Sequence, residues 1–166
     1  PWLVMLLFIG MLSATIMGQF EETISKVVAL AYFMPLIAGM TGNTGTQSLA
    51  LVIRGLSHGE INRTVISKLI RRELIVGLII GTVCSVLIAG LAFVWKGEPV
   101  LALVVGASLW CTLIIGTMAG TVIPLLLNYF KVDPAIASGP LITTINDIFS
   151  LTIYFSIATL FIHKLL

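Results

Sequence analysis

Long apolar stretches separated by short polar segments dominate the chain. Apolar sequence of about 20 residues is long enough to cross a bilayer as a helix. The pattern predicts five such helices, over residues of about 1–20, 24–56, 74–95, 100–127 and 136–162. Because spanning segments must satisfy their own backbone hydrogen bonds, we expect an all-α membrane protein with a single transmembrane domain over residues 1–166.

The polar connections predict how these helices are oriented. The longest, Arg54–Glu73, contains five basic residues and is expected to be a hydrophilic loop. Basic residues collect on the cytoplasmic side of membrane proteins, so this loop should be cytoplasmic. Trp95–Pro99 and Asn128–Pro134 are expected to be short turns. The predicted order of the helices then places the amino terminus in the cytoplasm as well.

Glycine and amide side chains interrupt the apolar pattern of the second predicted helix. Pro35 is expected to interrupt this helix, and Gly39, Gly42 and Gly45 then recur at every third position. Such glycines are typical of a face that packs closely against another helix. They also suit backbone that lines a watery cavity at membrane depth. Asn43 and Gln47, which lie one helical turn apart among the glycines, favour the cavity.

Asp147 is the most informative residue of the last predicted helix. We expect it to be the only carboxylate deep in the membrane. A charge at that depth costs a few kcal/mol and normally faces protein or a watery cavity. Helical spacing places it on one polar face with Pro140, Thr143, Thr144, Ser150 and Tyr154. A structural aspartate bonded to a neighbouring helix is the simpler interpretation. The surrounding polar stripe favours an ion or proton pathway.

Composition supports an integral membrane protein located in the cell membrane. The chain is 58% hydrophobic and 10% charged, and its mean hydropathy is +1.14. A soluble domain of 166 residues has no interior large enough for so much apolar side chain. The net charge of +2 does not suggest a nucleic-acid partner. Since the chain begins with Pro1, we expect an excised membrane domain whose first helix spans the bilayer and is not a signal peptide.

The residues that could carry catalysis are few, and an enzyme is not expected. Intramembrane aspartyl proteases need two carboxylates that share a proton, and only one is predicted to be buried. His58 lies in the basic loop and His163 at the end of the last helix, so neither is placed for hydrolysis. Cys84 and Cys111 are isolated in apolar sequence and are interpreted as buried thiols.

The polar groups of the predicted helices are mainly oxygen ligands, which suit the transport of a hard cation. A carboxylate, hydroxyls and backbone carbonyls are typical ligands of Mg2+ or Ca2+. One carboxylate cannot balance a divalent ion, whereas a twofold homodimer with Asp147 near its axis supplies two. Mg2+ loses its water reluctantly, so a wide site that holds the hydrated ion through Asp147, Asn43 and carbonyls is the simplest scheme.

Two sequence motifs resemble a known family. Met34–Gln47, followed by Arg54-Gly55-Leu56, resembles the second membrane helix of the MgtE magnesium channel family. Ala137–Pro140, leading to Thr143–Asp147, resembles its fifth. The similarity covers essentially the whole chain. It implies a homodimer in the lipid bilayer, with a pore at the dimer axis lined by the second and fifth helices. It also implies cytoplasmic Mg2+-sensing domains in the full-length chain.

The resemblance further implies roles for individual residues. Asp147 corresponds to the acidic residue that binds the hydrated ion, and Thr143, Gly39 and Gly42 to positions whose main-chain oxygens face it. Asn43 is the asparagine of the first motif. Mg2+ is thus the expected transported ion, passing as through a channel. A proton- or sodium-coupled secondary transporter of a divalent cation is the alternative hypothesis, and a non-transporting membrane anchor is a third.

Overall fold

The computed structural model describes residues 2–57, 63–133 and 139–165. In these residues the elements are α1 (Trp2–Gly18), α2 (Glu21–Lys26), α3 (Ala29–Ser57), α4 (Arg63–Lys96), α5 (Pro99–Tyr129), α6 (Gly139–Leu160) and α7 (Ile162–Leu165). No strand occurs within these described ranges. The all-α prediction is therefore confirmed.

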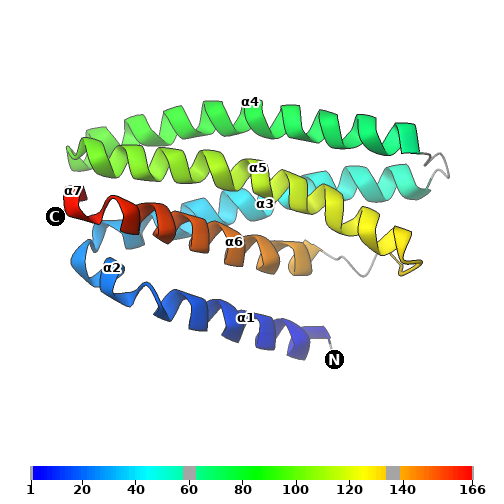
Figure 1. Ribbon diagram of the computed structural model, residues 1–166, viewed down its shortest axis with the longest axis horizontal. Helices are drawn as coiled ribbons and strands as arrows, with labels where there is room; N and C mark the ends of the chain where they lie inside the picture. The colour runs from blue at the N-terminus through cyan, green and yellow to red at the C-terminus, as the bar shows by residue number, and fades with distance from the viewer. Residues whose placement is uncertain (1, 58–62, 134–138, 166) are drawn as a thin grey trace.

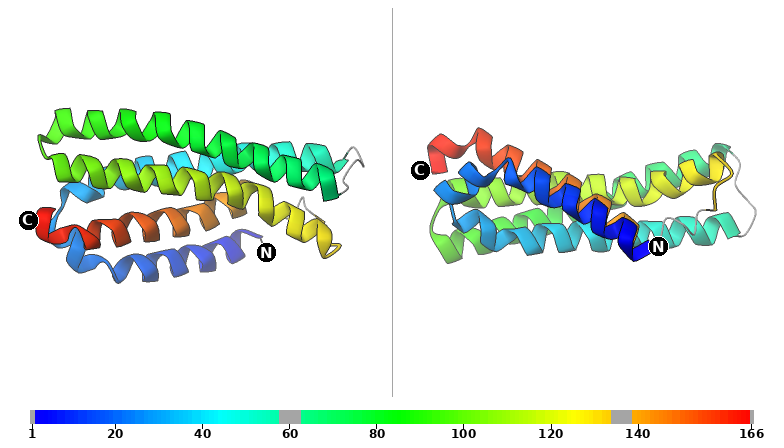
Figure 2. Two further views of the ribbon diagram at one scale, coloured as in Figure 1. Left: turned by 45° about the horizontal axis from the view of Figure 1, so that its top comes forward. Right: turned by 90° about the horizontal axis from the view of Figure 1, so that it is seen from below.

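The long helices run side by side in alternating directions (Figure 1). α1, α4 and α6 run one way, and α3 and α5 run the other way. α5 packs against α3, α4 and α6, while α1 contacts mainly α6 at the edge of the bundle (Figure 2). One end of the bundle holds α2, the turn between α4 and α5, and α7. The Trp95–Pro99 turn is as predicted, and Gly97 adopts a φ of 73°, a left-handed conformation that glycine accepts readily.

Within residues 2–57, 63–133 and 139–165, three helices are long and apolar enough to cross a bilayer: Thr64–Lys96, Pro99–Tyr129 and Gly139–Leu160. α1 has a shorter apolar stretch, Leu6–Gly18, and α3 contains the glycine and amide residues that lower its hydropathy. Large apolar side chains on α4 are exposed: Ile79, Val83, Val86, Leu87 and Val94. So extensive an apolar surface is unfavourable in water and suits contact with lipid.

The structure corrects three of the predicted boundaries. Arg54–Glu73 is not one long loop, because α4 already begins at Arg63 and is 34 residues long. Lys68, Arg71 and Arg72 lie at helical spacing, so their polarity marks an exposed helix face rather than a connection. At about 1.5 Å per residue, α4 is about 50 Å long and exceeds the thickness of a bilayer.

The second predicted helix is divided differently from the expectation. α2 ends at Lys26 and α3 begins at Ala29, so 24–56 is not one element. Pro35 lies inside α3 without ending it. Proline lacks a backbone N–H and removes one helical hydrogen bond, but the turns on both sides remain helical. The predicted start of the last helix, at 136–138, lies outside the described residues.

Glycines allow α3 and α5 to approach closely where they cross. A Cβ on Gly120 would overlap the carbonyl oxygen of Gly45. A Cβ on Gly116 would lie 2.9 Å from the carbonyl oxygen of Thr41. In each case the neighbour is backbone, which cannot rotate away as a side chain can. Gly116 and Gly120 of α5 therefore serve helix packing.

The close contact between Gly120 and Gly45 predicts that one added methyl group destabilises the protein. Gly120→Ala should reduce the free energy of unfolding by about 1–3 kcal/mol, because α5 must move away from α3. Thermal unfolding of the protein in detergent measures the change. Gly90→Ala in α4 is the matched control, since a Cβ there meets no atom within 4 Å. It should be neutral or stabilise by up to about 1 kcal/mol through helix propensity. Equal effects of the two substitutions would contradict the close contact.

Candidate ion-binding site

Two contacts determine how α3 and α6 lie against each other. The hydroxyl of Tyr154 donates a hydrogen bond of 2.9 Å to the carbonyl oxygen of Leu30. A Cβ on Gly42 would lie 2.9 Å from Cγ2 of Thr143. The contacts are 12 residues apart on α3 and 11 apart on α6, so the antiparallel helices keep register between them. Interpolation between the two contacts places Asp147 about level with Ala38, one residue from Gly39.

Asp147 carries a carboxylate oxygen that lacks a protein partner. The residue is half-buried, but its Oδ1 is buried and accepts no hydrogen bond from the residues that the structure describes. The nearby hydroxyls donate to backbone instead: Thr143 to Gly139 at 2.9 Å and Thr144 to Pro140 at 2.8 Å. No basic side chain pairs with Asp147 in the described part of the chain. A buried oxygen of this kind requires water or a cation.

The polar stripe of α6 is divided between two environments. Thr143, Thr144 and Asp147 are half-buried, and Pro140 is exposed. Ser150 and Tyr154 are completely buried, and Tyr154 belongs to the apolar core through its bond to α3. Only the first half of the stripe, up to Asp147, is therefore positioned to line a path for ions. The predicted residues all lie in the single helix α6, at the spacing of one face, but the second half of that face is buried in the protein.

The glycine segment of α3 likewise serves two purposes. Gly42 packs against Thr143, and Gly45 packs against Asn146 and the backbone of Gly116. Gly39, Asn43 and Gln47 are exposed, and a Cβ on Gly39 would meet no atom within 4 Å. The packing hypothesis therefore describes Gly42 and Gly45. The other three residues form an exposed polar face, which we call the α3 polar face.

Asn146 is a buried polar residue that the sequence analysis did not identify. Its side chain is fully buried, and its Nδ2 donates to the carbonyl oxygen of Thr41 at 3.4 Å. Its Oδ1 accepts no hydrogen bond from the described residues. Asn146 therefore links α6 to α3 one residue before Asp147. Its place in the sequence, beside an aspartate in an apolar helix, was the available signal.

Glu73 corrects the expectation that only one carboxylate of the chain is buried. Glu73 lies in α4 with 2% of its surface exposed, and the hydroxyl of Ser48 donates to its Oε2 at 2.7 Å. Ser48 lies about 15 Å along α3 from the level of Asp147, at 1.5 Å per residue. The two carboxylates are thus too far apart to share a proton as a catalytic pair does.

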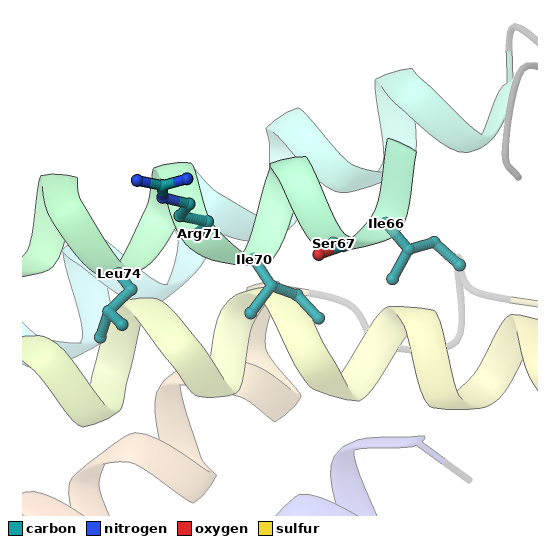
Figure 3. Close-up of a pocket in the computed structure, with 5 residues that line it drawn as sticks. All are labelled: Ile66, Ser67, Ile70, Arg71 and Leu74. Carbon is teal, nitrogen blue, oxygen red and sulfur yellow. The ribbon is translucent and has the colours of Figure 1, made fainter. Parts of the chain in front are cut away.

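The other candidate sites in the described structure offer fewer ligands for a divalent cation than Asp147 does. Among the described residues, no three His, Cys, Asp or Glu side chains come together around a common point. A groove of about 440 Å³ is lined by residues of α4 alone. Figure 3 shows Ile66, Ile70 and Leu74 pointing toward α5 and Arg71 pointing away from it. This apolar groove has no ligand for a divalent cation, whereas Asp147 offers a carboxylate.

The family comparison decides how this arrangement is classified. A model of the MgtE family, described as divalent cation transporters, matches residues 34–157. The chain belongs to the MgtE family. The match contains Gly39, Gly42, Asn43, Thr143 and Asp147, so all five predicted site residues lie within it. The predicted resemblance is confirmed, and the family is one of transporters rather than enzymes.

Relatives of the MgtE family match nearly the whole chain. A protein named Magnesium transporter MgtE from Bacillus subtilis (strain 168) is 62% identical over 99% of this chain. Proteins with the same name from Enterococcus faecalis and Thermus thermophilus are 40% and 38% identical, each over 98% of the chain. The chain spans 36–37% of the length of these relatives. Together with the three apolar helices, family membership identifies a multi-pass membrane protein.

The unpartnered oxygen of Asp147 predicts a stability effect. Asp147→Asn should raise the free energy of unfolding by about 1 kcal/mol when divalent cations are removed, because a neutral amide costs less to bury than an uncompensated carboxylate. Thermal unfolding in a chelating buffer measures it. Glu98→Gln removes the same charge at an exposed turn and should change stability by less than about 0.5 kcal/mol. Clear destabilisation by Asp147→Asn would instead indicate that the carboxylate is structurally bonded.

Proposed function

We propose that this chain is the single transmembrane domain of a magnesium transporter, in which two copies form a pore for hydrated Mg2+ along α3 and α6. Three relatives are named magnesium transporters. The observation that carries the proposal is the buried Oδ1 of Asp147, which has no hydrogen-bond partner in the described part of the chain. Passage is channel-like, with the ion as substrate and no group of the protein chemically changed.

The proposed ion site combines one charge per chain with neutral oxygens. Asp147 supplies the charge, and Gly39 lies within about one residue of its level on the neighbouring helix. The main-chain oxygens of Gly39, Gly42 and Thr143 remain able to accept, because a helical carbonyl keeps a second lone pair. Asn43 adds an amide on the exposed side of α3. These groups contact the water shell of Mg2+, which the ion releases reluctantly.

The α3 polar face supports the assembly of two copies. Gly39, Asn43 and Gln47 are exposed in the single chain, although polar groups at membrane depth normally face protein or water. A second copy related by a twofold axis would cover this face and enclose a water-filled path. It would also bring a second Asp147, so that two negative charges balance one divalent ion.

The membrane orientation follows from the distribution of basic residues. We propose that all five long helices, α1 and α3–α6, cross the bilayer. The end of α3, the start of α4 and the end of α5 with the turn that follows it lie toward one end of the bundle (Figure 1), and the sequence of these segments contains Arg54, Arg63, Lys68, Arg71, Arg72 and Lys131. α2, the turn between α4 and α5, and α7 lie at the other end, and their sequence contains Lys26, Lys96 and Lys164. The more basic end is assigned to the cytoplasm, which places the amino terminus there. Mg2+-sensing cytoplasmic domains belong to the proposed full-length protein.

Ion flux tests the role of Asp147. In proteoliposomes with an inward Mg2+ gradient and no Na+ or pH gradient, the parent protein should conduct. Asp147→Asn should reduce flux at least tenfold, because neutral oxygens alone do not offset the cost of a divalent ion in the membrane. Asn43→Ala should lower flux only several-fold.

Matched controls separate this role from folding. Glu98→Gln should conduct like the parent, since it removes a carboxylate outside the helices. Size-exclusion chromatography with light scattering should show that Asp147→Asn retains the parent's oligomeric state. Parental flux through an intact Asp147→Asn protein would contradict the proposed site. Flux only with a Na+ or proton gradient would favour a coupled transporter over a channel.

Thiol labelling tests whether the α3 polar face lines water. In a background with Cys84 and Cys111 replaced by alanine, Asn43→Cys and Gln47→Cys should react with a small charged thiol reagent in membranes. Mg2+ should slow both reactions by occupying the path. Val86→Cys is the control, because Val86 is 67% exposed on the apolar outer face of α4 and should contact lipid. Labelling of Asn43→Cys as slow as that of Val86→Cys would place the face in lipid.

A further inference from the structure

Glu73 is a buried carboxylate that the proposed Mg2+ path does not use. It lies in α4 and is bonded by the hydroxyl of Ser48 on α3. Within residues 2–57, 63–133 and 139–165, no basic side chain forms an ion pair with it. One hydrogen bond does not compensate a carboxylate removed from water, because the cost of burying an ion is several kcal/mol. Arg72 lines the same cavity, and a bound cation would lower the remaining cost of burying an ionised Glu73.

A cavity lies against this carboxylate. Its volume is about 120 Å³, which is several times the volume of a water molecule in the liquid. Besides Glu73, its polar lining is Thr44, Gln47, Ser48, Thr117 and Arg72. α3, α4 and α5 all contribute, so the cavity lies between three packed helices. It is both polar and large enough to hold a small ion with water.

The hydroxyl groups around the cavity are oriented to accept. Thr44 donates to the carbonyl oxygens of Met40 and Thr41, at 3.1 and 3.0 Å. Thr117 donates to those of Leu113 and Ile114, at 3.0 and 2.8 Å. Ser48 donates to Glu73. With their hydrogens used in this way, the three hydroxyl oxygens keep lone pairs for a cation.

We propose that Glu73, Ser48, Thr44 and Thr117 form a binding site for one monovalent alkali-metal cation, separate from the Mg2+ path. A single carboxylate balances a single positive charge, whereas a divalent ion would leave net charge in a poorly solvated site. The oxygen ligands are hard and suit such an ion. Arg72 lines the same cavity and is exposed, so it opposes the cation and weakens its binding.

The site lies beside the α3 polar face and is separated from Asp147 along α3. Thr44 and Ser48 are buried, Gly39 and Asn43 are exposed, and the exposed Gln47 also lines the cavity. A bound cation would hold α3 against α4 through Ser48 and Glu73. The site is thus positioned to stabilise the helix that carries half of the proposed pore, whether or not Mg2+ passes along that helix.

Thermal unfolding of the full chain in detergent tests the site. The buffer contains a chelator for divalent ions, and NaCl or KCl replaces choline chloride at constant ionic strength. The unfolding temperature of the parent should rise with Na+ or K+ and saturate, because a ligand that binds only the folded state stabilises it. Glu73→Gln should lose the response, and Asp147→Asn should retain it. No response of the parent to either cation, or an unchanged response of Glu73→Gln, would overturn the proposal.

Two milder variants keep the test decisive if Glu73→Gln does not fold. Ser48→Ala removes one oxygen and should raise the half-saturating cation concentration several-fold. Arg72→Gln removes the opposing charge and should lower it several-fold. Unchanged half-saturation in both variants would overturn the site. A protein stabilised by low pH but by neither alkali cation would contain a protonated, structural Glu73, and this result would also overturn the proposal.

Discussion

The interior of a bilayer supplies no water for hydrogen bonding, and this constraint accounts for most of the structure. Each buried polar group must find a partner within the protein or face an aqueous space. The hydroxyls of Thr41, Thr117 and Thr121 meet it by donating to carbonyl oxygens of their own helices. Tyr154 meets it by bonding to Leu30 on another helix. Buried oxygens of Ser108, Asn146 and Asp147 find no partner among the described residues. A pore is proposed for Asp147 together with the α3 polar face.

Close packing at glycine holds α3 against α5 and α6. Where the helices cross, Gly45 contacts the backbone of Gly116 and Gly120 on α5 and the side chain of Asn146 on α6. Gly42 admits Thr143 in the next turn. Without hydrophobic driving force between helices in lipid, such contacts and interhelical hydrogen bonds supply the association energy. The same contacts orient α6 so that Asp147 lies about level with Ala38, one residue from Gly39.

The two ion sites proposed along α3 differ in their charge. The proposed Mg2+ path has a single carboxylate per chain, and a second copy is needed to balance a divalent ion. Glu73, by contrast, is enclosed by α3, α4 and α5, so one chain completes the proposed site for a monovalent ion. The proposed site at Asp147 thus needs two chains and suits a divalent ion. The proposed site at Glu73 needs one chain and suits a monovalent ion.

Local pattern was enough to predict what depends on neighbours in sequence. Apolar length predicted the all-helical membrane fold, and the motifs around Asn43 and Asp147 predicted the family. Pattern could not show that Arg63–Glu73 belongs to α4, because a basic amphipathic helix and a polar loop have similar composition. Nor could it assign Gly42 to packing and Gly39 to exposure, since both glycines look alike in sequence. Those outcomes, and the burial of Glu73 beside Ser48, depend on which helix lies opposite each residue, and contacts between distant segments are established only when the chain folds.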